Sequence, residues 1–297
     1  MFIKPSRFVS TLYFCLMEAG KYFLYNGKLI ASGKAVITAD NRSFRFGDGC
    51  FETMKMIAGN IVLNNYHFER LFSSLALLKF ETPEYFTAAD LAEQIKKLAL
   101  KNKHTNARIR LTIFRGDGSL YEYENNIPNY IIQTWPLLTL ASTFNKEGLA
   151  TGVYKHARKT SDGFSHIKTN NFLPYAMAAI WAKENKLDDA IILNNYGRVA
   201  EATIANIFLV NDGKIKTPAL TEGCIQGVMR RYLIECIKKE NIPFQETVIT
   251  TEELAGANEL FITNTVKGIS HIAKCGNNNY GFQLSEYLYN RYLLSLT

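Results

Sequence analysis

The sequence predicts an α+β fold in two domains, and three features of the chain lead to this prediction. The first half contains stretches with the two-residue alternation of strands and stretches with the helical spacing of apolar residues. The second half mixes short strands with helices in rapid succession, which favours a barrel-like or mixed sheet over a doubly wound one. Pro136 and the following "LLTLASTFNKEG" look like a connector between the halves. We therefore expect a small domain at residues 21–140 and a larger one at residues 141–297, after an N-terminal extension at residues 1–20.

The small domain opens with two predicted hairpins, followed by two predicted helices. Asn26-Gly27 stands between two apolar runs and is a strong signal for a two-residue turn. The stretch "FETMKMIAGNIVLN" suggests a second hairpin, with Gly59-Asn60 as its turn. Apolar residues at helical spacing then predict a helix from Tyr66 to Phe80. Thr87 and Asp90 resemble a capping box that opens a second helix.

The next predicted strand, "ARIRLTIF", alternates apolar residues with Arg108, Arg110 and Thr112. The two arginines therefore share one face of the strand. That face either points to water or carries cations for a substrate. A further strand, "YIIQTW", completes the small domain.

The larger domain contains the predicted strands "AIILNN", "RVAEAT", "NIFLVNDGKIKT" and "ELFIT". Asp212-Gly213 marks a hairpin within the third of these stretches. An amphipathic helix is expected from Gly227 to about Lys239.

The composition favours a globular protein and excludes several classes of function. With 47% hydrophobic residues, a chain of 297 residues can bury a substantial core. The net charge of +7 is spread along the chain without a basic tract, so we expect no binding of nucleic acid. No stretch is long and apolar enough to span a membrane. Five cysteines without a C-x-x-C pair indicate a reducing compartment, so we expect a cytoplasmic protein. The histidines lack the spacing of metal ligands, and we expect no metal site.

Residues 1–20 precede the patterned part of the chain. Lys4 and Arg7 stand before a short semi-apolar run that faintly resembles a secretion signal, but Ser10 and Thr11 interrupt it and no A-x-A site follows. We expect a weakly ordered extension, or a segment upstream of a true start at Met17.

The candidates for chemistry are polar groups embedded in apolar segments. Lys168, in "SHIKTNNF", has no charged neighbour, and Glu201 lies inside the predicted strand "GRVAEATIANIFLV". Gly227 opens an amphipathic helix whose free N–H groups could hold a phosphate. Asn264 and Thr265 end a strand and could add donors. Each could also be structural, as a partly buried lysine that extends to solvent would be.

Taken together, these groups match the needs of one cofactor. A lysine in a dry pocket has a depressed pKa and can form a Schiff base with an aldehyde. Pyridoxal phosphate requires such a lysine, an acid at its pyridine nitrogen and a phosphate cradle at a helix N-terminus.

The motifs "FRFGDGCFETMKM", "YHFERL", "HIKTNNFL", "GRVAEATIANIF", "GCIQGVMRRYL" and "ELFITNTVKGIS" resemble those of the class IV, fold-type IV pyridoxal-phosphate enzymes. This family contains branched-chain aminotransferases, D-amino acid aminotransferases and aminodeoxychorismate lyases, and the resemblance covers about residues 21–275. It implies a small α+β domain followed by a larger pseudo-barrel domain. It also implies a homodimer in which both chains contribute to the active sites.

The resemblance further implies which residues bind the cofactor. Lys168 would form the Schiff base and move the α-proton of the substrate. Glu201 would pair with the pyridine nitrogen. The phosphate contacts would come from the Arg70 side chain, from the backbone N–H groups of Val228 and Met229, and from Asn264 and Thr265.

The reaction is less clear than the family, because the motifs point to different branches. "FGDGCF" and the K-x-x-N-x-L pattern look more like the lyase and D-amino acid branches, and Leu173 stands where the branched-chain branch has tyrosine. Glu52 follows Phe51 as in the D-amino acid enzymes, whereas the lyases tend to have threonine. The loop after Arg115, "DGSLYEYENN", carries the signature of neither branch.

We expect a pyridoxal-phosphate-dependent aminotransferase that moves an amino group between an α-amino acid, branched-chain-like or a D-amino acid, and a 2-oxo acid. One alternative is an aminodeoxychorismate lyase that releases pyruvate and p-aminobenzoate. Another is a non-catalytic member of the family that binds the cofactor. The candidate substrate-binding residues are Phe51, Glu52, Arg108, Arg110 and Arg115, of which an arginine would bind the substrate carboxylate.

Overall fold

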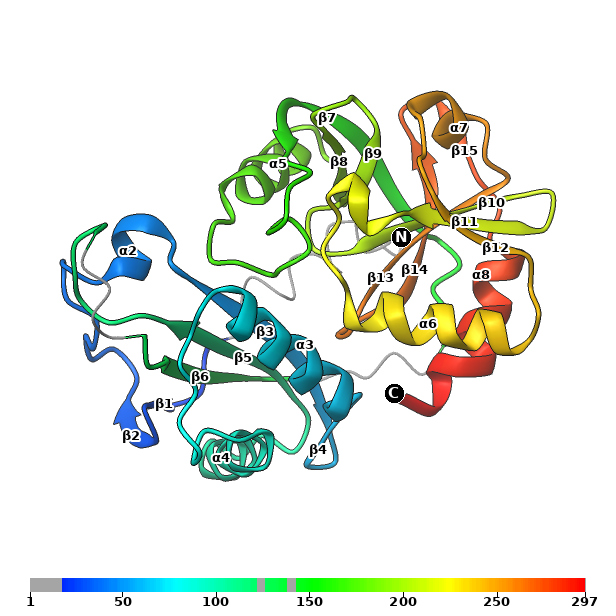
Figure 1. The fold of residues 1–297 in the computed structure, drawn as a ribbon. Coiled ribbons are helices and arrows are strands. Elements are labelled where there is room, and N and C mark those ends of the chain that lie inside the picture. Colours follow the sequence, from blue (N-terminus) through cyan, green and yellow to red (C-terminus); the bar gives the residue numbers. More distant parts are fainter. Residues whose placement is uncertain (1–17, 122–125, 138–142, 297) are drawn as a thin grey trace, which may run out of the picture.

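Two β-sheets organise the chain (Figure 1). The computed structural model describes residues 18–121, 126–137 and 143–296. The first sheet has the order β2-β1-β6-β5-β3-β4, and its neighbouring strands pair antiparallel. Its strands are β1 (Tyr22–Tyr25), β2 (Lys28–Ala31), β3 (Gly49–Ile57), β4 (Asn60–Ile61), β5 (Ala107–Phe114) and β6 (Asn129–Pro136), and its helices are α2 (Arg42–Phe46), α3 (Asn64–Leu77) and α4 (Ala88–Lys101).

The turns of the two hairpins follow the backbone chemistry of their residues. Asn26 and Gly27 have φ values of 47° and 77°, so the predicted turn between β1 and β2 is confirmed. The second turn lies one residue before its predicted position. Ala58 and Gly59 are its central residues, with φ values of 46° and 78°, and Asn60 already begins β4. A tight hairpin of this kind needs two consecutive residues with positive φ, and Ala58 adopts this conformation although its side chain disfavours it.

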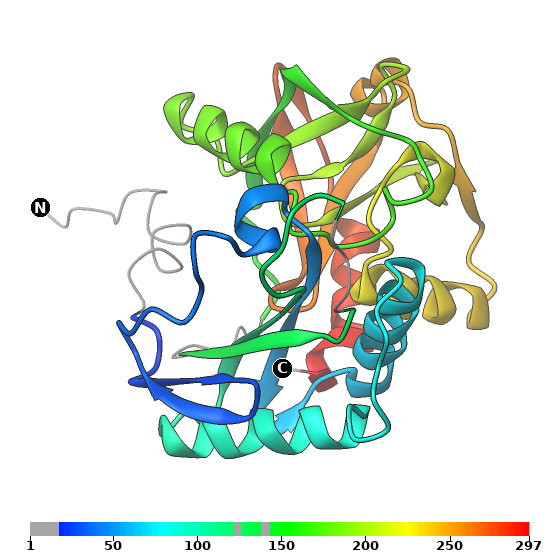
Figure 2. The same cartoon turned by 60° about the vertical axis from the view of Figure 1, so that its left-hand side comes forward.

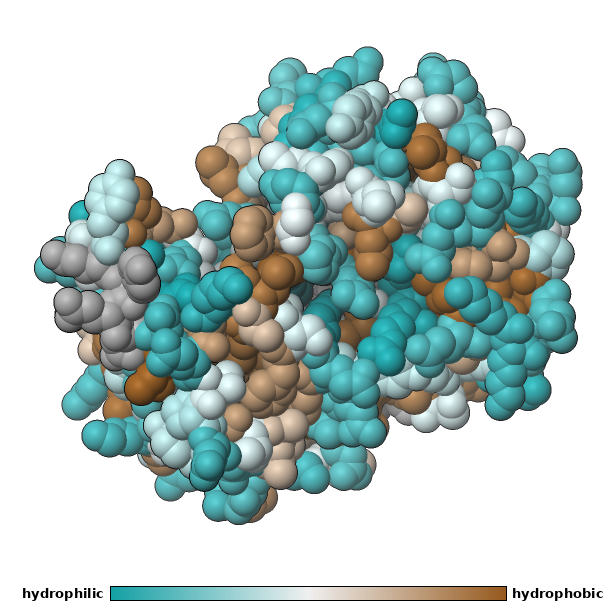
Figure 3. All heavy atoms as spheres, in the orientation of Figure 1, coloured by the Kyte–Doolittle hydropathy of each residue, from teal (hydrophilic) through white to brown (hydrophobic). Residues whose placement is uncertain are grey.

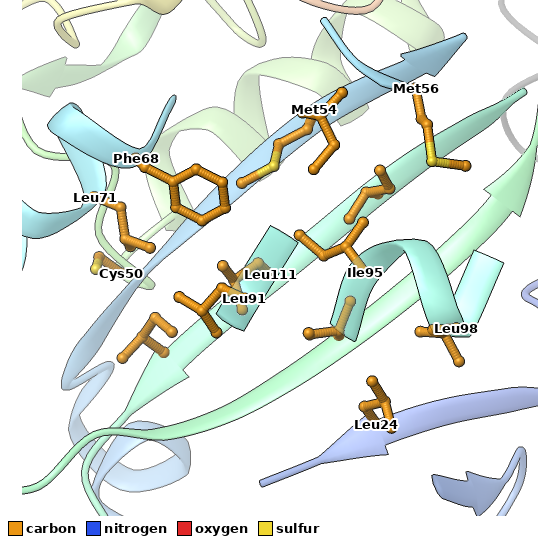
Figure 4. Packing of buried hydrophobic residues seen from close by; sticks show 14 of the residues in the cluster. Leu24, Cys50, Met54, Met56, Phe68, Leu71, Leu91, Ile95, Leu98 and Leu111 are labelled. Atoms are coloured by element: carbon orange, nitrogen blue, oxygen red, sulfur yellow. The ribbon is translucent and has the colours of Figure 1, made fainter. Parts of the chain in front are cut away.

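Helices α3 and α4 cover one face of the first sheet (Figure 4). Both predicted helices are confirmed, and Thr87 caps α4 by accepting a hydrogen bond from the backbone N–H of Asp90 at 3.1 Å. Apolar side chains of α3 and α4 pack on Met54 and Leu111 of the sheet. Because successive strand residues point to opposite faces, the odd-numbered residues of β3 are left on the other face. That face is turned toward the second sheet.

The second sheet is mixed, with the order β12-β11-β10-β13-β14-β7-β8-β9 and β15 beside β14. It contains antiparallel pairs such as β10–β13 and parallel pairs such as β7–β8. Asp212 and Gly213 form the predicted turn between β10 and β11, with φ values of 49° and 75°. The strands are β7 (Leu149–Lys159), β8 (Asp189–Asn194), β9 (Val199–Ala202), β10 (Asn206–Asn211), β11 (Lys214–Pro218), β12 (Phe244–Thr247), β13 (Glu259–Asn264), β14 (Gly268–Cys275) and β15 (Asn278–Asn279).

This sheet curls into a half-barrel around an apolar interior, and helices cover its outside (Figure 2). Helix α6 packs on β10 and β13 through Met229, Leu233 and Ile237, while α5 packs on β7 and β8. The predicted α+β fold with a pseudo-barrel second half is therefore confirmed. The helices are α5 (Leu173–Glu184), α6 (Val228–Lys239), α7 (Thr251–Ala255) and α8 (Gln283–Leu288), with short turns η1 (Leu220–Glu222), η2 (Tyr289–Leu293) and η3 (Leu294–Leu296).

Two expectations concern residues outside the described ranges. Residues 1–17 of the expected extension are not among them, and neither is the segment 138–142 at the expected domain boundary. The division into domains near residue 140 therefore stays a prediction. Among the helices that are described, none has both the length and the apolar composition needed to cross a membrane.

Candidate active site

A cavity of about 290 Å³ lies between the two sheets. Its wall combines side chains of β3 and β5 from the first sheet with residues of β9, β13 and the start of α6 from the second half of the chain. Two of the residues singled out in the sequence, Glu52 and Arg115, are not among the residues that line it. Those that do line it are Phe51, Arg70, Arg108, Arg110, Lys168, Glu201, Val228, Met229, Asn264 and Thr265.

Lys168 reaches the cavity because its loop pairs with the start of β3. The N–H of Phe51 donates to the Lys168 carbonyl at 2.9 Å, and the N–H of Asn170 donates to the Gly49 carbonyl at 3.0 Å. Gly49 has a φ of 152°, and a Cβ atom there would lie 2.2 Å from the Ile113 carbonyl oxygen. The second glycine of "FGDG" therefore permits the close approach that fixes the lysine beside the sheet.

The Lys168 amine lies among aromatic rings and buried charges. Its Nζ atom is 4.5 Å from the centre of the Phe51 ring and 5.1 Å from that of Phe172. Burial, followed by the positive charge of Arg70, lowers the pKa of Lys168 from 10.5 to about 7, although Glu52 and Glu201 act in the opposite direction. A large fraction of the amine is therefore neutral near pH 7 and can act as a nucleophile or a base.

This lowered pKa predicts how the stability of the cofactor-free protein depends on pH. Between pH 7 and 10.5 the unfolded chain binds the Lys168 proton more tightly than the folded protein, so stability rises with pH across this window. The Lys168→Met variant lacks this dependence. We expect it to be more stable than wild type at pH 7 by about 2 kcal/mol in unfolding free energy, a value discounted for partial exposure to the cavity. Denaturant unfolding at several pH values measures the difference, and identical pH profiles for both proteins would contradict the lowered pKa.

Glu201 lies across the cavity from the first sheet, in β9, and its side chain is buried at 2% exposure. Its Oε1 atom accepts from Lys159 Nζ at 2.6 Å, from the Tyr175 hydroxyl at 2.6 Å and from the Ile225 N–H at 3.1 Å. The same N–H lies 3.1 Å from Oε2. Donors surround the carboxylate, and Lys159 compensates its charge, so an anion is stable here.

The N-terminus of α6 also lines the cavity. Its N-cap residue, Gly227, has no side chain to cap the free N–H groups of the first turn, which includes Val228 and Met229. A Cβ atom at Gly227 would lie 1.9 Å from Oδ1 of Asn206, so the position suits glycine. Such a helix end binds anions through its N–H groups and its dipole.

Polar groups of β13 and α3 complete this end. Within the described residues, the buried Thr263 hydroxyl of the cavity wall has no hydrogen-bond partner. The Thr265 hydroxyl donates to the Thr53 carbonyl at 2.9 Å. Asn264 uses its Oδ1 atom in the following turn, where it accepts from the Lys267 N–H at 2.8 Å. Arg70 lies beside α6 and donates through Nη1 to the Gln226 carbonyl at 3.0 Å.

Glu52 points away from the cavity, toward α3. It is 1% exposed and accepts from Arg70 Nε at 2.7 Å, from Arg70 Nη2 at 2.6 Å and from His67 Nδ1 at 2.7 Å. Burial raises the pKa of Glu52, but Arg70 and His67 outweigh burial and lower this pKa to about 2. The ionised carboxylate fixes Arg70 at the edge of the cavity.

Arg108 and Arg110 both face the cavity from β5. The Arg110 guanidinium lies 3.7 Å from the centre of the Phe51 ring, and the Arg108 guanidinium lies 4.3 Å from that of Trp135. Burial and the charge of Arg108 lower the pKa of Arg110 to about 10. Lys55 stands opposite Arg108 in the antiparallel register and therefore shares this face. The half-buried Arg108 and Arg110, with the buried Lys55 on the same face, attract anions to this side of the cavity.

Arg115 lies outside this group of cations. Its Nη1 atom donates to Asp48 Oδ1 at 2.5 Å and its Nε atom to Asn126 Oδ1 at 3.0 Å, so the side chain ties the end of β5 to the "FGDG" segment. It supports the surroundings of the cavity and does not line it.

Two residues of the site escape prediction from the sequence. Lys159 and Tyr175 both contact Glu201, from positions that are 42 and 26 residues away along the chain. Lys159 is one of several lysines near Lys168 in the sequence, and nothing beside it marks an acid as its partner. Its sequence neighbours, Arg158 and Thr160, are polar, so the local sequence gives no signal that this lysine is buried.

The arrangement fits pyridoxal phosphate. An amine with a lowered pKa, a buried carboxylate and an anion-binding helix end line the same cavity. These are the three groups that this cofactor requires. Across residues 18–121, 126–137 and 143–296, no cluster of three or more His, Cys, Asp or Glu side chains could hold a metal ion.

Comparisons with known proteins show the family to which the chain belongs. The sequence model of the family described as amino-transferase class IV matches residues 49–275. The aminodeoxychorismate lyase of Bacillus subtilis (strain 168) is 30% identical over 267 residues, which cover 88% of this chain and 89% of that protein. The D-alanine aminotransferase of Listeria monocytogenes serotype 1/2a (strain 10403S) is 25% identical over 268 residues, with 84% and 86% covered.

Solved structures match the fold over nearly its whole length. The branched-chain aminotransferase of the archaeon Thermoproteus uzoniensis, with norvaline, has a TM-score of 0.82 at 25% identity and covers 93% of this chain and 95% of its own. A branched-chain aminotransferase from T.th., with pyridoxamine 5′-phosphate, has a TM-score of 0.82 at 23% identity and covers 95% of each chain. Members of the matching family bind pyridoxal phosphate. The chain belongs to the class IV aminotransferase family and is an enzyme of the aminotransferase or aminodeoxychorismate lyase type.

Proposed function

We propose that this chain is a pyridoxal-phosphate-dependent aminotransferase that moves an amino group between an α-amino acid and a 2-oxo acid, with Lys168 as its catalytic residue. The observation that carries the proposal is the Lys168 amine, whose pKa is lowered to about 7 in a cavity between a carboxylate and a helix N-terminus. The similarity to a D-alanine aminotransferase and to a branched-chain aminotransferase structure supports the same reaction.

In this proposal, different residues bind different parts of the cofactor. Lys168 holds the aldehyde, and Glu201 faces the ring nitrogen. Arg70 and the N–H groups of Val228 and Met229 hold the phosphate, with Asn264, Thr265 and the unpartnered hydroxyl of Thr263 beside them. When bound, pyridoxal phosphate supplies an electron-withdrawing ring that stabilises negative charge at the substrate α-carbon.

Lys168 then moves the proton that the reaction requires. Its neutral amine accepts the α-proton of the amino acid at Nζ and can return it to another carbon, as a general base and acid with a pKa near the working pH does. Phe51 and Phe172 lie beside Nζ, so apolar rings cover part of the amine. Such cover limits loss of the proton to solvent during the transfer.

We assign the substrate carboxylate to Arg110, with Arg108 as its neighbour. Arg110 stacks on the Phe51 ring that also faces Lys168, so an anion bound to it lies near the reacting amine. Glu52, a candidate for substrate binding on the sequence alone, acts instead by fixing Arg70. Arg115 acts by holding Asp48.

Replacing Arg110 by leucine tests this assignment. We expect KM for the amino acid to rise about 10- to 100-fold, because a hydrogen bond between charged groups is lost, while kcat changes less. Steady-state kinetics with one amino acid over a range of concentrations gives both constants. The control is Arg158→Leu, which removes an arginine of β7 outside the cavity. An unchanged KM in Arg110→Leu would mean that another cation binds the substrate carboxylate.

The alternative reaction, elimination of pyruvate from aminodeoxychorismate, has support of its own. The Bacillus subtilis lyase is 30% identical to this chain, and a substrate with two carboxylates would also suit Arg108 and Arg110. The test is to give the purified enzyme single L- and D-amino acids with a 2-oxo acid, and separately aminodeoxychorismate. New 2-oxo acid identifies an aminotransferase, and p-aminobenzoate identifies a lyase. Turnover of neither would contradict both assignments of the substrate.

We further propose that the enzyme works as a cytoplasmic homodimer. Large apolar side chains are exposed around α2 and α5, and apolar atoms are visible beside α5 (Figure 3). Burial of such side chains against a second copy would be favourable. Light scattering measures the mass, and a monomer at assay concentration would contradict the proposal. The exposed residues in question are Phe44, Phe164, Leu173, Met177 and Ile180.

A further inference from the structure

We propose that Lys159 is a positioning residue that holds Glu201 as a carboxylate anion and leaves one of its oxygens available to the cavity. The inference rests on the proposed function only in that Glu201 is expected to face the cofactor. Lys159 ends β7, is 8% exposed, and donates from Nζ to Oε1 of Glu201 at 2.6 Å. The two charges are buried together, so either one without the other would be an uncompensated charge in the protein interior.

The hydrogen bonds of Glu201 distinguish its two oxygens. Oε1 accepts from the Lys159 ammonium, from the Tyr175 hydroxyl and from the Ile225 N–H. Oε2 shares that N–H at 3.1 Å and has a weak contact with Asn206 Nδ2 at 3.3 Å. Since Lys159 and Tyr175 occupy Oε1, the oxygen that can still accept a strong hydrogen bond is Oε2.

Two titratable groups beside Glu201, Tyr175 and Cys224, do not ionise near neutral pH. Tyr175, from α5, has its pKa raised well above 10 by burial and by the Glu201 charge, so its hydroxyl remains a donor. Burial raises the pKa of Cys224 to about 12, so it remains a thiol. Neither group therefore adds a charge beside the Lys159–Glu201 pair. Arg230, which also acts on Cys224, has its charge compensated by Glu246 at 2.8 Å.

The charge of Lys159 affects the proton affinity of every group that binds a proton in the cavity. A fixed positive charge behind Glu201 disfavours additional positive charge in a buried site. Removing that charge should therefore raise the proton affinity of the bound cofactor. A residue with a purely structural role would leave this affinity unchanged.

The first test is a double-mutant cycle on the cofactor-free protein with Lys159→Met, Glu201→Gln and the double variant. We expect each single variant to lower Tm by at least about 5 °C, because it leaves one buried charge alone. The double variant, which has no charge there, should recover most of this loss. Additive losses in the double variant would overturn the proposal. If Lys159→Met does not fold, the Tm of the double variant still tests the proposal, because the proposal requires the double variant to fold.

The second test is the visible absorbance of protein loaded with pyridoxal phosphate, titrated with acid and base. We expect the midpoint of Lys159→Met to lie about one pH unit above that of wild type, and that of Lys159→Arg to lie near wild type. Lys155→Met, on the same strand but exposed, is the control. An unshifted midpoint in Lys159→Met would overturn the proposal. Failure of cofactor binding would give a different result, because wild type would then show no visible band while the stability cycle kept its outcome. A lyase in place of an aminotransferase would keep both the band and the expected shift.

Discussion

Replacing Lys168 by alanine is expected to abolish covalent attachment of pyridoxal phosphate and to lower transamination by at least about 10³-fold. The variant loses both the amine that binds the aldehyde and the base that moves the α-proton, and a base alone contributes about 10²- to 10⁴-fold. Reduction of the loaded protein with borohydride, followed by peptide mass mapping, should find the cofactor on the peptide that contains Lys168 in wild type and on no peptide in the variant.

The matched control for this experiment is Lys155→Ala, which removes an exposed lysine nearby in the sequence. It should retain both the modified peptide and full activity. Attachment of the cofactor to another lysine in the Lys168→Ala variant, with activity retained, would contradict the assignment. Lys159 is the buried lysine that this result would implicate.

Glu201→Gln has the second largest expected effect. We expect a fall in kcat of at least about 100-fold, because an amide carries no negative charge to stabilise a proton on the cofactor ring. Stability should also fall by about 3–5 kcal/mol, since the Lys159 ammonium is left buried without its partner. Steady-state kinetics and denaturant unfolding measure the two losses separately.

Glu222→Gln distinguishes the catalytic loss from the structural one. Glu222 is also buried, at 5% exposure, and is paired with Arg198 at 3.2 Å, but it does not line the cavity. Its glutamine variant should lose stability while kcat of the folded enzyme stays near wild type. If Glu201→Gln likewise kept its kcat, the carboxylate would have no part in catalysis.

Local chemistry explains which elements the sequence could predict. Asn26-Gly27 and Asp212-Gly213 each have the two positive φ values that a tight hairpin requires, and both turns are confirmed. The turn at Ala58-Gly59 lies one residue before the predicted one, although the glycine–asparagine pair has the stronger local preference for a turn. Pairing of Met56 with Ile61 puts both residues in the apolar core and thereby fixes the register.

The environment of each strand face could not be predicted, because residues distant in the sequence decide it. Alternation placed Arg108 and Arg110 on one face, but only the second sheet turns that face into a cavity wall. Alternation also separates Phe51 from Glu52, which therefore point to the cavity and to α3 respectively. The Lys159–Glu201 pair joins two strands of the second sheet, and neither residue carries a local sign of the other.

The measurement that tests the central claim most directly is the visible spectrum of the protein loaded with pyridoxal phosphate, recorded before and after addition of single amino acids. We predict that at least one amino acid converts the band of the bound cofactor to that of the pyridoxamine form and releases one equivalent of 2-oxo acid. A band that no L- or D-amino acid changes, together with release of p-aminobenzoate from aminodeoxychorismate, would contradict the aminotransferase and establish the lyase.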